Sequence, residues 1–117
     1  MLRGYLLVDD EREFLALARE LLGGRTAVVG EASDAGEAER LVDSARPAVA
    51  IVDVHLAGSS GFHVAKRLLE RSPELRVVMV SSVDEPSFGD LSRSVGAAGF
   101  LPKKRLSPAA LETLLGA

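Results

Sequence analysis

The sequence predicts an α/β fold in which a doubly wound, five-stranded parallel sheet carries helices on both faces. Short apolar runs occur at residues 5–8, 26–29, 48–52, 76–80 and 99–101. A stretch with helical spacing of its apolar residues follows each of them. Strand and helix alternating five times is typical of a parallel sheet with right-handed crossovers. The predicted arrangement is therefore a (βα)5 domain.

Capping residues mark the first two predicted helices. A helix is expected over residues 11–22, and Asp10 can serve as its N-cap. A second helix is expected to begin after Ser33 or Asp34, either of which can cap it, and to end before Pro47. These helices connect the first three strands.

The second half of the chain repeats the alternation with weaker signals. A loop rich in glycine and serine is expected over residues 55–61, before the third helix. The fourth helix, over residues 86–95, is predicted to be weak because it contains Gly89 and several serines, and glycine costs about 1 kcal/mol relative to alanine in a helix. Ser107 and Pro108 open the fifth helix.

Composition excludes several classes of protein. The chain has 117 residues, of which 47% are hydrophobic, a net charge of -3 and no cysteine. A single domain spanning residues 1–117 is expected. Without cysteine there is no disulfide framework or thiolate metal site. No basic surface for nucleic acid and no membrane span is predicted, so a cytoplasmic protein is expected.

Acidic residues stand where two predicted strands end. Asp9 and Asp10 follow the first strand, and Asp53 follows the third. The carboxyl ends of parallel strands form the ligand crevice of an open α/β sheet. Three carboxylates there repel one another by roughly 4 kcal/mol per pair at about 4 Å. Such a cluster predicts a site for a divalent cation, and Mg²⁺ prefers these oxygen ligands.

A hydroxyl and an ammonium group share this predicted edge. Ser81 ends the fourth strand, and Lys103 follows the fifth. Both can bind phosphoryl oxygens, and a carboxylate can attack phosphorus to form an acyl phosphate. The set therefore indicates phosphoryl transfer. Asp10 as a simple helix cap and Lys103 as part of a solvated basic run are the alternatives.

The sequence resembles the receiver domain of two-component response regulators, which are CheY-like proteins, over nearly its whole length. The matching segments are Val8-Asp9-Asp10-Glu11, Val52-Asp53 through Gly61, Val80-Ser81-Ser82, and Gly96-Ala97-Ala98-Gly99-Phe100-Leu101-Pro102-Lys103. The resemblance implies a flavodoxin-like strand order, 2-1-3-4-5.

The resemblance also implies roles for individual residues. Asp53 would accept phosphate from a histidine kinase or phosphotransfer protein. Asp10, Asp53 and the backbone carbonyl of His55 would ligate Mg²⁺, with Asp9 assisting through water. Ser81 and Lys103 would bind the phosphoryl group. Ser81 and Phe100 would act as switch residues, so that the face formed by the fourth helix, fifth strand and fifth helix binds a downstream protein or a second copy of the chain.

Two positions depart from the family pattern. Ala57 and Lys104 stand where the family usually has proline, so the geometry of the peptide bond between Lys103 and Lys104, often cis in the family, is open. A pseudo-receiver that binds partners without phosphorylation is the main alternative function. A phosphatase of the haloacid dehalogenase type is disfavoured because His55 replaces its second aspartate. The cognate kinase, the output and the presence of further domains are open.

Overall fold

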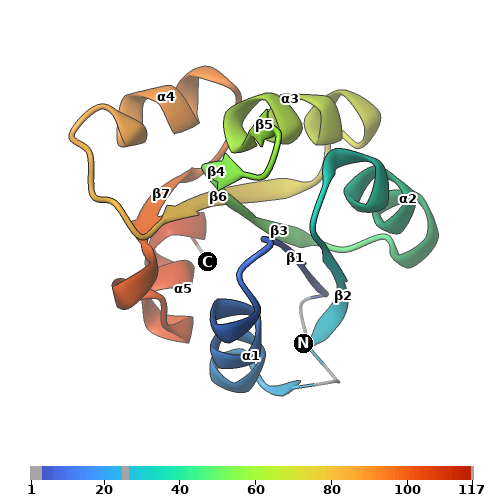
Figure 1. Cartoon of the computed structure of the whole chain (residues 1–117), viewed down its shortest axis with the longest axis horizontal. Coiled ribbons are helices and arrows are strands. Elements are labelled where there is room, and N and C mark those ends of the chain that lie inside the picture. Colours follow the sequence, from blue (N-terminus) through green and yellow to red (C-terminus); the bar gives the residue numbers. More distant parts are fainter. Residues whose placement is uncertain (1–3, 25–26, 117) are drawn as a thin grey trace.

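The computed structural model describes residues 4–24 and 27–116. Five parallel strands form one sheet in the order β2-β1-β3-β6-β7. This is the predicted order 2-1-3-4-5, because the intervening labels belong to a small separate hairpin (Figure 1). The strands are β1 (Tyr5–Val8), β2 (Val28–Ala32), β3 (Val49–Asp53), β6 (Arg76–Ser81) and β7 (Gly99–Pro102).

The strand bounds differ most from the prediction at β2. This strand was expected at residues 26–29 but runs from Val28 to Ala32, and residue 26 lies outside the described residues. Here Leu6 pairs with Gly30 and Val8 with Ala32. Because β2 is an edge strand, it is exposed along its middle and includes polar residues, so hydrophobicity alone placed it too early.

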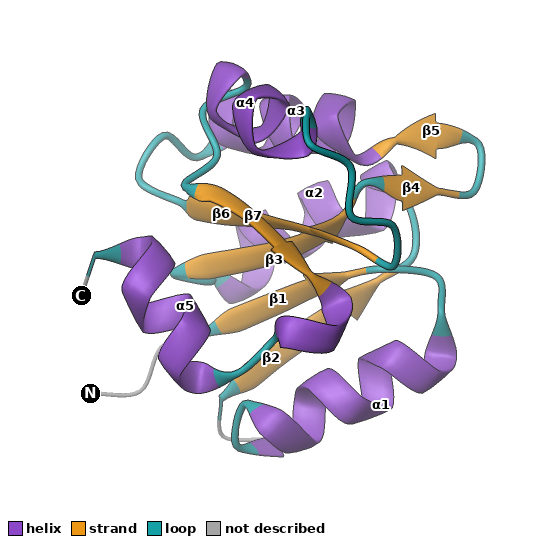
Figure 2. Cartoon of the chain, turned by 90° about the vertical axis from the view of Figure 1, so that its left-hand side faces the viewer, coloured by secondary structure: helices purple, strands orange, loops and turns teal. Residues whose placement is uncertain are grey.

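Two layers of helices enclose the sheet, as Figure 2 shows. One layer is α1 (Arg12–Leu21) and α5 (Pro108–Leu115), and the other is α2 (Ala35–Ala45), α3 (Gly61–Arg71) and α4 (Phe88–Ser94). Alternate strand residues face opposite layers: Leu6 and Val52 pack with α2, α3 and α4, whereas Leu7 and Ile51 pack with α1 and α5. Each face of the sheet therefore has its own apolar core.

Most helix caps follow the sequence prediction, but the first does not. Asp34 caps α2 by accepting a hydrogen bond from Glu37 N at 2.8 Å, and Ser107 caps α5 by accepting one from Ala110 N at 3.0 Å. The predicted N-cap of α1, Asp10, is wrong: Glu11 occupies that position without a side-chain cap. The Asp10 carboxylate instead accepts a hydrogen bond from Ala57 N at 3.1 Å, which turns it away from the helix.

Three further local features differ from the prediction. The expected loop over residues 55–61 contains an antiparallel hairpin of β4 (His55–Leu56) and β5 (Ser59–Ser60). A short 3₁₀ turn, η2 (Lys103–Arg105), follows β7, and α4 has only seven residues. No peptide bond among the described residues is cis, including the one between Lys103 and Lys104.

Candidate functional site

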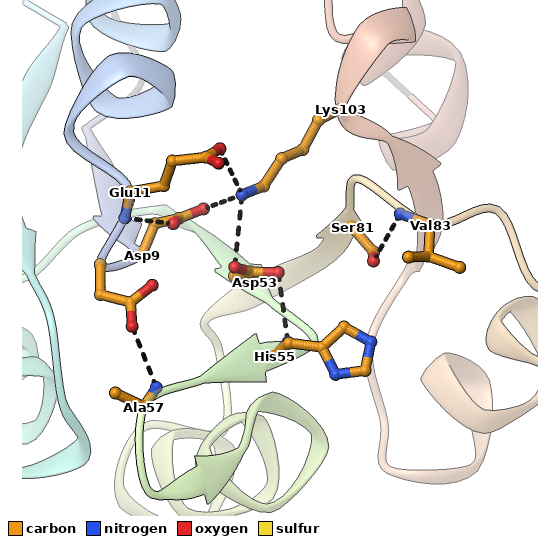
Figure 3. Close-up of polar contacts among 9 residues, drawn as sticks. Asp9, Glu11, Asp53, His55, Ala57, Ser81, Val83 and Lys103 are labelled. Carbon is orange, nitrogen blue, oxygen red and sulfur yellow. Dashed lines mark hydrogen bonds and ion pairs between the residues drawn. The ribbon is translucent and has the colours of Figure 1, made fainter.

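The strand register brings the predicted site residues to one edge of the sheet. Val8 pairs with Val52, Asp53 with Val80, and Ser81 with Pro102. Asp9, which follows Val8, and Lys103, which follows Pro102, therefore lie at the same carboxyl-terminal edge as Asp53. Figure 3 shows the side chains of Asp9, Asp53 and Lys103 converging there from the segment after β1, the end of β3 and η2.

Three carboxylates form the centre of this edge. Oxygen atoms of Asp9, Asp10 and Asp53 all lie within 4.8 Å of one another. Asp9 and Asp53 are buried, with 1% and 5% of their surface exposed, whereas Asp10 is exposed to solvent. A buried pair of acids with a third acid at the solvent boundary offers a cation both ligands and a route of entry.

The Lys103 ammonium group lies inside this acidic cluster. Its Nζ atom is 2.8 Å from Asp9 Oδ2, 3.3 Å from Asp53 Oδ2 and 3.2 Å from Glu11 Oε1 (Figure 3). It also lies 4.5 Å from the centroid of the Phe14 ring. Only 10% of the Lys103 side chain is exposed. Of the three adjacent basic residues, Lys103 is therefore directed into the site, whereas Lys104 and Arg105 are exposed.

Burial and charge act in opposite directions on the two most enclosed groups. Burial raises the pKa of Asp9 above its usual value, and the nearby Asp53 charge adds to this, although the hydrogen bonds to Lys103 and to the Glu11 backbone oppose it. Burial alone would lower the pKa of Lys103, but its hydrogen bonds and its attraction to Asp9, Asp53 and Glu11 raise it overall. The lysine is thus held as a cation, while the charge of Asp9 is costly.

Backbone groups fix the orientation of each carboxylate. Glu11 N donates to Asp9 Oδ1 at 2.8 Å, and His55 N donates to Asp53 Oδ1 at 3.2 Å. The bond from Ala57 N to Asp10 requires an N–H group, which a proline at this position would lack. The departure from the family pattern at Ala57 therefore supplies a contact to one of the proposed metal ligands.

The donor set fits a hard divalent cation. Its members are carboxylate oxygens, which Mg²⁺ prefers. Asp9 Oδ2 is buried, and Lys103 Nζ lies 2.8 Å from it. A carboxylate oxygen has two lone pairs, so this atom can bind a cation in addition to the lysine. Asp9, Asp10 and Asp53 are consequently the residues that could hold the metal.

The two predicted switch residues, Ser81 and Phe100, lie at the end of β6 and in β7. The Ser81 hydroxyl is fully buried and accepts a hydrogen bond from Val83 N at 3.0 Å, so its own proton remains to be donated. No hydrogen bond joins Ser81 to Asp53 among the described residues. The Phe100 ring, from β7, is half-buried and packs against the Phe88 ring with centroids 5.3 Å apart.

One functional position, Gly61, escaped the prediction of individual site residues. A Cβ atom there would lie 1.8 Å from the backbone oxygen of Asp53 and 2.9 Å from Val54 Cα. Its N–H also donates to Val54 O at 2.7 Å. Only glycine lets α3 begin this close to the end of β3. The glycine stands directly after the loop in the sequence, but local spacing gave no sign of the contact.

Known proteins show the same pattern of sequence and structure. The model of the response regulator receiver domain family matches residues 5–115. The photosynthetic apparatus regulatory protein RegA of Rhodobacter capsulatus is 35% identical over 104 residues, covering 86% of this chain and 55% of RegA. The transcriptional activator protein ExaE of Pseudomonas putida is 36% identical over 113 residues, covering 95% of this chain and 53% of ExaE.

A solved structure agrees with these sequence matches. The signal receiver domain of the response regulator NarL from Mycobacterium tuberculosis is similar with a TM-score of 0.80 and 32% identity, and the similarity covers 99% of this chain and 98% of that domain. By contrast, the chain spans about half the length of the curated relatives it matches.

Proposed function

Because this chain belongs to the response regulator receiver domain family of two-component systems, we propose that Asp53 is its phosphoacceptor. The set of contacts around the Asp53 carboxylate carries this proposal. One oxygen faces Lys103 Nζ at 3.3 Å, the other accepts from His55 N at 3.2 Å, and Asp9 and Asp10 lie beside it. The position joins a nucleophile, a cation and candidate metal ligands.

In the proposed reaction, an Asp53 oxygen forms a bond to phosphorus as the bond between phosphorus and the donor's histidine nitrogen breaks. Lys103 binds one phosphoryl oxygen, and the buried Ser81 hydroxyl donates its proton in a hydrogen bond to another. Asp10, Asp53 and the His55 carbonyl would hold Mg²⁺, with Asp9 assisting through water. The ion would supply positive charge beside the transferring group.

The protein is regulatory rather than an enzyme that turns over external substrates. We propose that its chemistry is limited to its own phosphoryl transfer and dephosphorylation. Exposed Asp10 leaves the metal side of the site open to water. The exposed His55 ring also borders this opening, but it packs against the Phe88 ring, with centroids 5.9 Å apart.

Phosphorylation and dephosphorylation of Asp53 imply two kinds of protein partner, a phosphoryl donor and a protein that receives the signal. The donor is proposed to be a histidine kinase or phosphotransfer protein, and the face of α4, β7 and α5 is proposed to bind a downstream protein or a second copy of the chain. Residues 1–117 are taken as a single receiver domain working in the cytoplasm. No helix in the described parts of the chain combines the length and apolar character that crossing a membrane requires.

Phosphorylation with a small donor tests the assignment. Incubation with acetyl phosphate and Mg²⁺ should add one phosphoryl group, measured by intact mass. Asp53→Asn should abolish labelling because the nucleophile is lost, and omission of Mg²⁺ should slow it at least about tenfold. Asp43→Asn, which changes an exposed carboxylate at the opposite edge of the sheet, should label normally.

The outcomes separate the candidate functions. Labelling that persists in Asp53→Asn would contradict the site, and a wild-type chain that accepts no phosphoryl group would support the pseudo-receiver alternative. For the output face, hydrogen exchange of the labelled protein should change in residues 82–106. Changes confined to α2 and α3 would place the output elsewhere.

A further inference from the structure

A cluster of four aromatic rings lies next to the acidic site and centres on Phe88. The Phe88 ring makes edge-on contacts with three others: His55 at 5.9 Å, Phe62 at 5.8 Å and Phe100 at 5.3 Å between ring centroids. These neighbours come from β4, α3 and β7. Phe88 itself is 9% exposed. One side chain of α4 thus contacts both the loop after Asp53 and the proposed switch strand.

The hairpin that carries His55 has few contacts of its own. Each of its strands has two residues, and they pair only through His55 with Ser60 and Leu56 with Ser59. A hairpin this small is not stable by itself. Leu56 anchors it in the core, and the His55 ring anchors it on Phe88. The same His55 residue donates its N–H to Asp53 and is the proposed carbonyl ligand.

The position of α4, which carries Phe88, also depends on the packing of this ring. The helix α4 has seven residues and lacks a side-chain N-cap. Its buried residues are Phe88 and Ser92, and the Ser92 hydroxyl donates to Phe88 O at 2.6 Å. Phe88 is therefore the buried apolar residue that fastens the beginning of this helix to the rest of the domain.

We propose that Phe88 is a positioning residue for the phosphoryl-transfer site, acting through the His55 ring. Its ring holds the β4-β5 hairpin so that the His55 backbone faces Asp53 and the metal. This inference rests on the proposed function of Asp53. Through Phe100, the same ring links the site to the face of α4, β7 and α5. Because coupling between two sites is reciprocal, loading the Asp53 site must also favour one position of α4.

Magnesium titration of variants tests the contact without requiring phosphorylation. Phe88→Leu and His55→Ala should each weaken Mg²⁺ affinity by about 2- to 10-fold, the effect expected from losing one aromatic pair. The double variant should be no weaker than either single variant, because both changes remove the same contact. Phe88→Tyr keeps the ring and should restore the affinity.

Phe62→Leu is the matched control. It removes a ring that contacts Phe88 but, among the described residues, makes no ring contact with His55, so Mg²⁺ affinity should stay within about twofold of wild type. The proposal would be overturned if Phe62→Leu weakened Mg²⁺ affinity as much as Phe88→Leu does. It would also be overturned if the effects of Phe88→Leu and His55→Ala on that affinity were additive. If Phe88→Leu fails to fold, as judged by circular dichroism, exposed His55→Ala still decides the question, since unchanged affinity would refute it.

Labelling of Asp53 by acetyl phosphate in wild type is measured alongside. Absence of labelling would remove the proposed function, whereas the magnesium titration tests the role of Phe88 independently. With labelling intact, Phe88→Leu should also reduce the hydrogen-exchange response in residues 82–106. An undiminished response in a variant whose metal affinity has fallen would show that Phe88 does not carry the link to the output face.

Discussion

The two edges of the sheet hold similar groups of charges in different surroundings. At the carboxyl-terminal edge, Lys103 contacts Asp9, Asp53 and Glu11, and the lysine is 10% exposed. At the opposite edge, Arg71 binds Asp43 through two nitrogens, at 2.8 Å and 2.7 Å, with 45% and 52% of the two side chains exposed. Arg71 also contacts Glu39. Both cations, Lys103 and Arg71, therefore contact more than one carboxylate.

The surroundings reverse the effect on the acids. The hydrogen bond from Arg71 lowers the pKa of Asp43, as expected for an exposed ion pair. Asp9 has a lysine just as close, yet burial raises its pKa. A surface pair of this kind stabilises a protein by about 0–1 kcal/mol. The negative charge of buried Asp9 is unfavourable in the folded protein. Binding of a cation next to it would relieve this cost.

The largest effect is expected from adding a single carbon at the carboxyl-terminal edge. Gly61→Ala would place Cβ against the Asp53 carbonyl, so it should abolish phosphorylation and lower the free energy of unfolding by about 3 kcal/mol. Gly36→Ala in α2 is the control, because its nearest neighbours lie at 3.5 Å. Urea unfolding should show this control unchanged or slightly more stable. Equal tolerance at both positions would contradict the close approach.

Removing the cation from each edge sharpens the comparison further. Lys103→Met leaves Asp9 and Asp53 buried without their counterion, so we expect a loss of about 3 kcal/mol at neutral pH. Arg71→Met should cost much less, because its ion pairs are exposed to solvent. Mg²⁺ should restore part of the stability of Lys103→Met only, measured by urea unfolding with and without the ion. Equal losses in both variants would mean that burial does not distinguish the two groups.

The smallest effect concerns acid stability at the exposed edge. The pKa of Asp43 in the folded chain lies below its ordinary value of 3.8, so the unfolded chain binds more protons in the interval between them. Stability from this group is present above pH 3.8 and is lost as the pH falls through the lowered pKa. Asp43→Asn should therefore lose less stability than wild type on acidification. Thermal unfolding at neutral and acidic pH measures the difference, and parallel curves would contradict it.

The sequence by itself determined the alternation of strands and helices and the residues that meet at the proposed functional edge, and the strand order came from the resemblance to receiver domains. Four of the five apolar runs are followed within two residues by one of these polar residues: Asp9, Asp53, Ser81 or Lys103. In a parallel sheet all strands end at the same edge, so local sequence position is enough to predict which side chains meet. The resemblance to receiver domains then assigned their roles. The sequence alone therefore groups Asp9, Asp10 and Asp53.

Tertiary structure decided the contacts between loops. Asp10 was predicted as a metal ligand that could also cap the first helix, but its carboxylate accepts a hydrogen bond from Ala57 N, 47 positions away in the chain, and does not cap the helix. The closeness of Gly61 to Asp53 and the ring contacts of Phe88 were likewise absent from the sequence prediction. Local periodicity reports which face of an element is buried, whereas such contacts depend on how far apart the packed elements lie. That distance is set by the volumes of all the side chains between them.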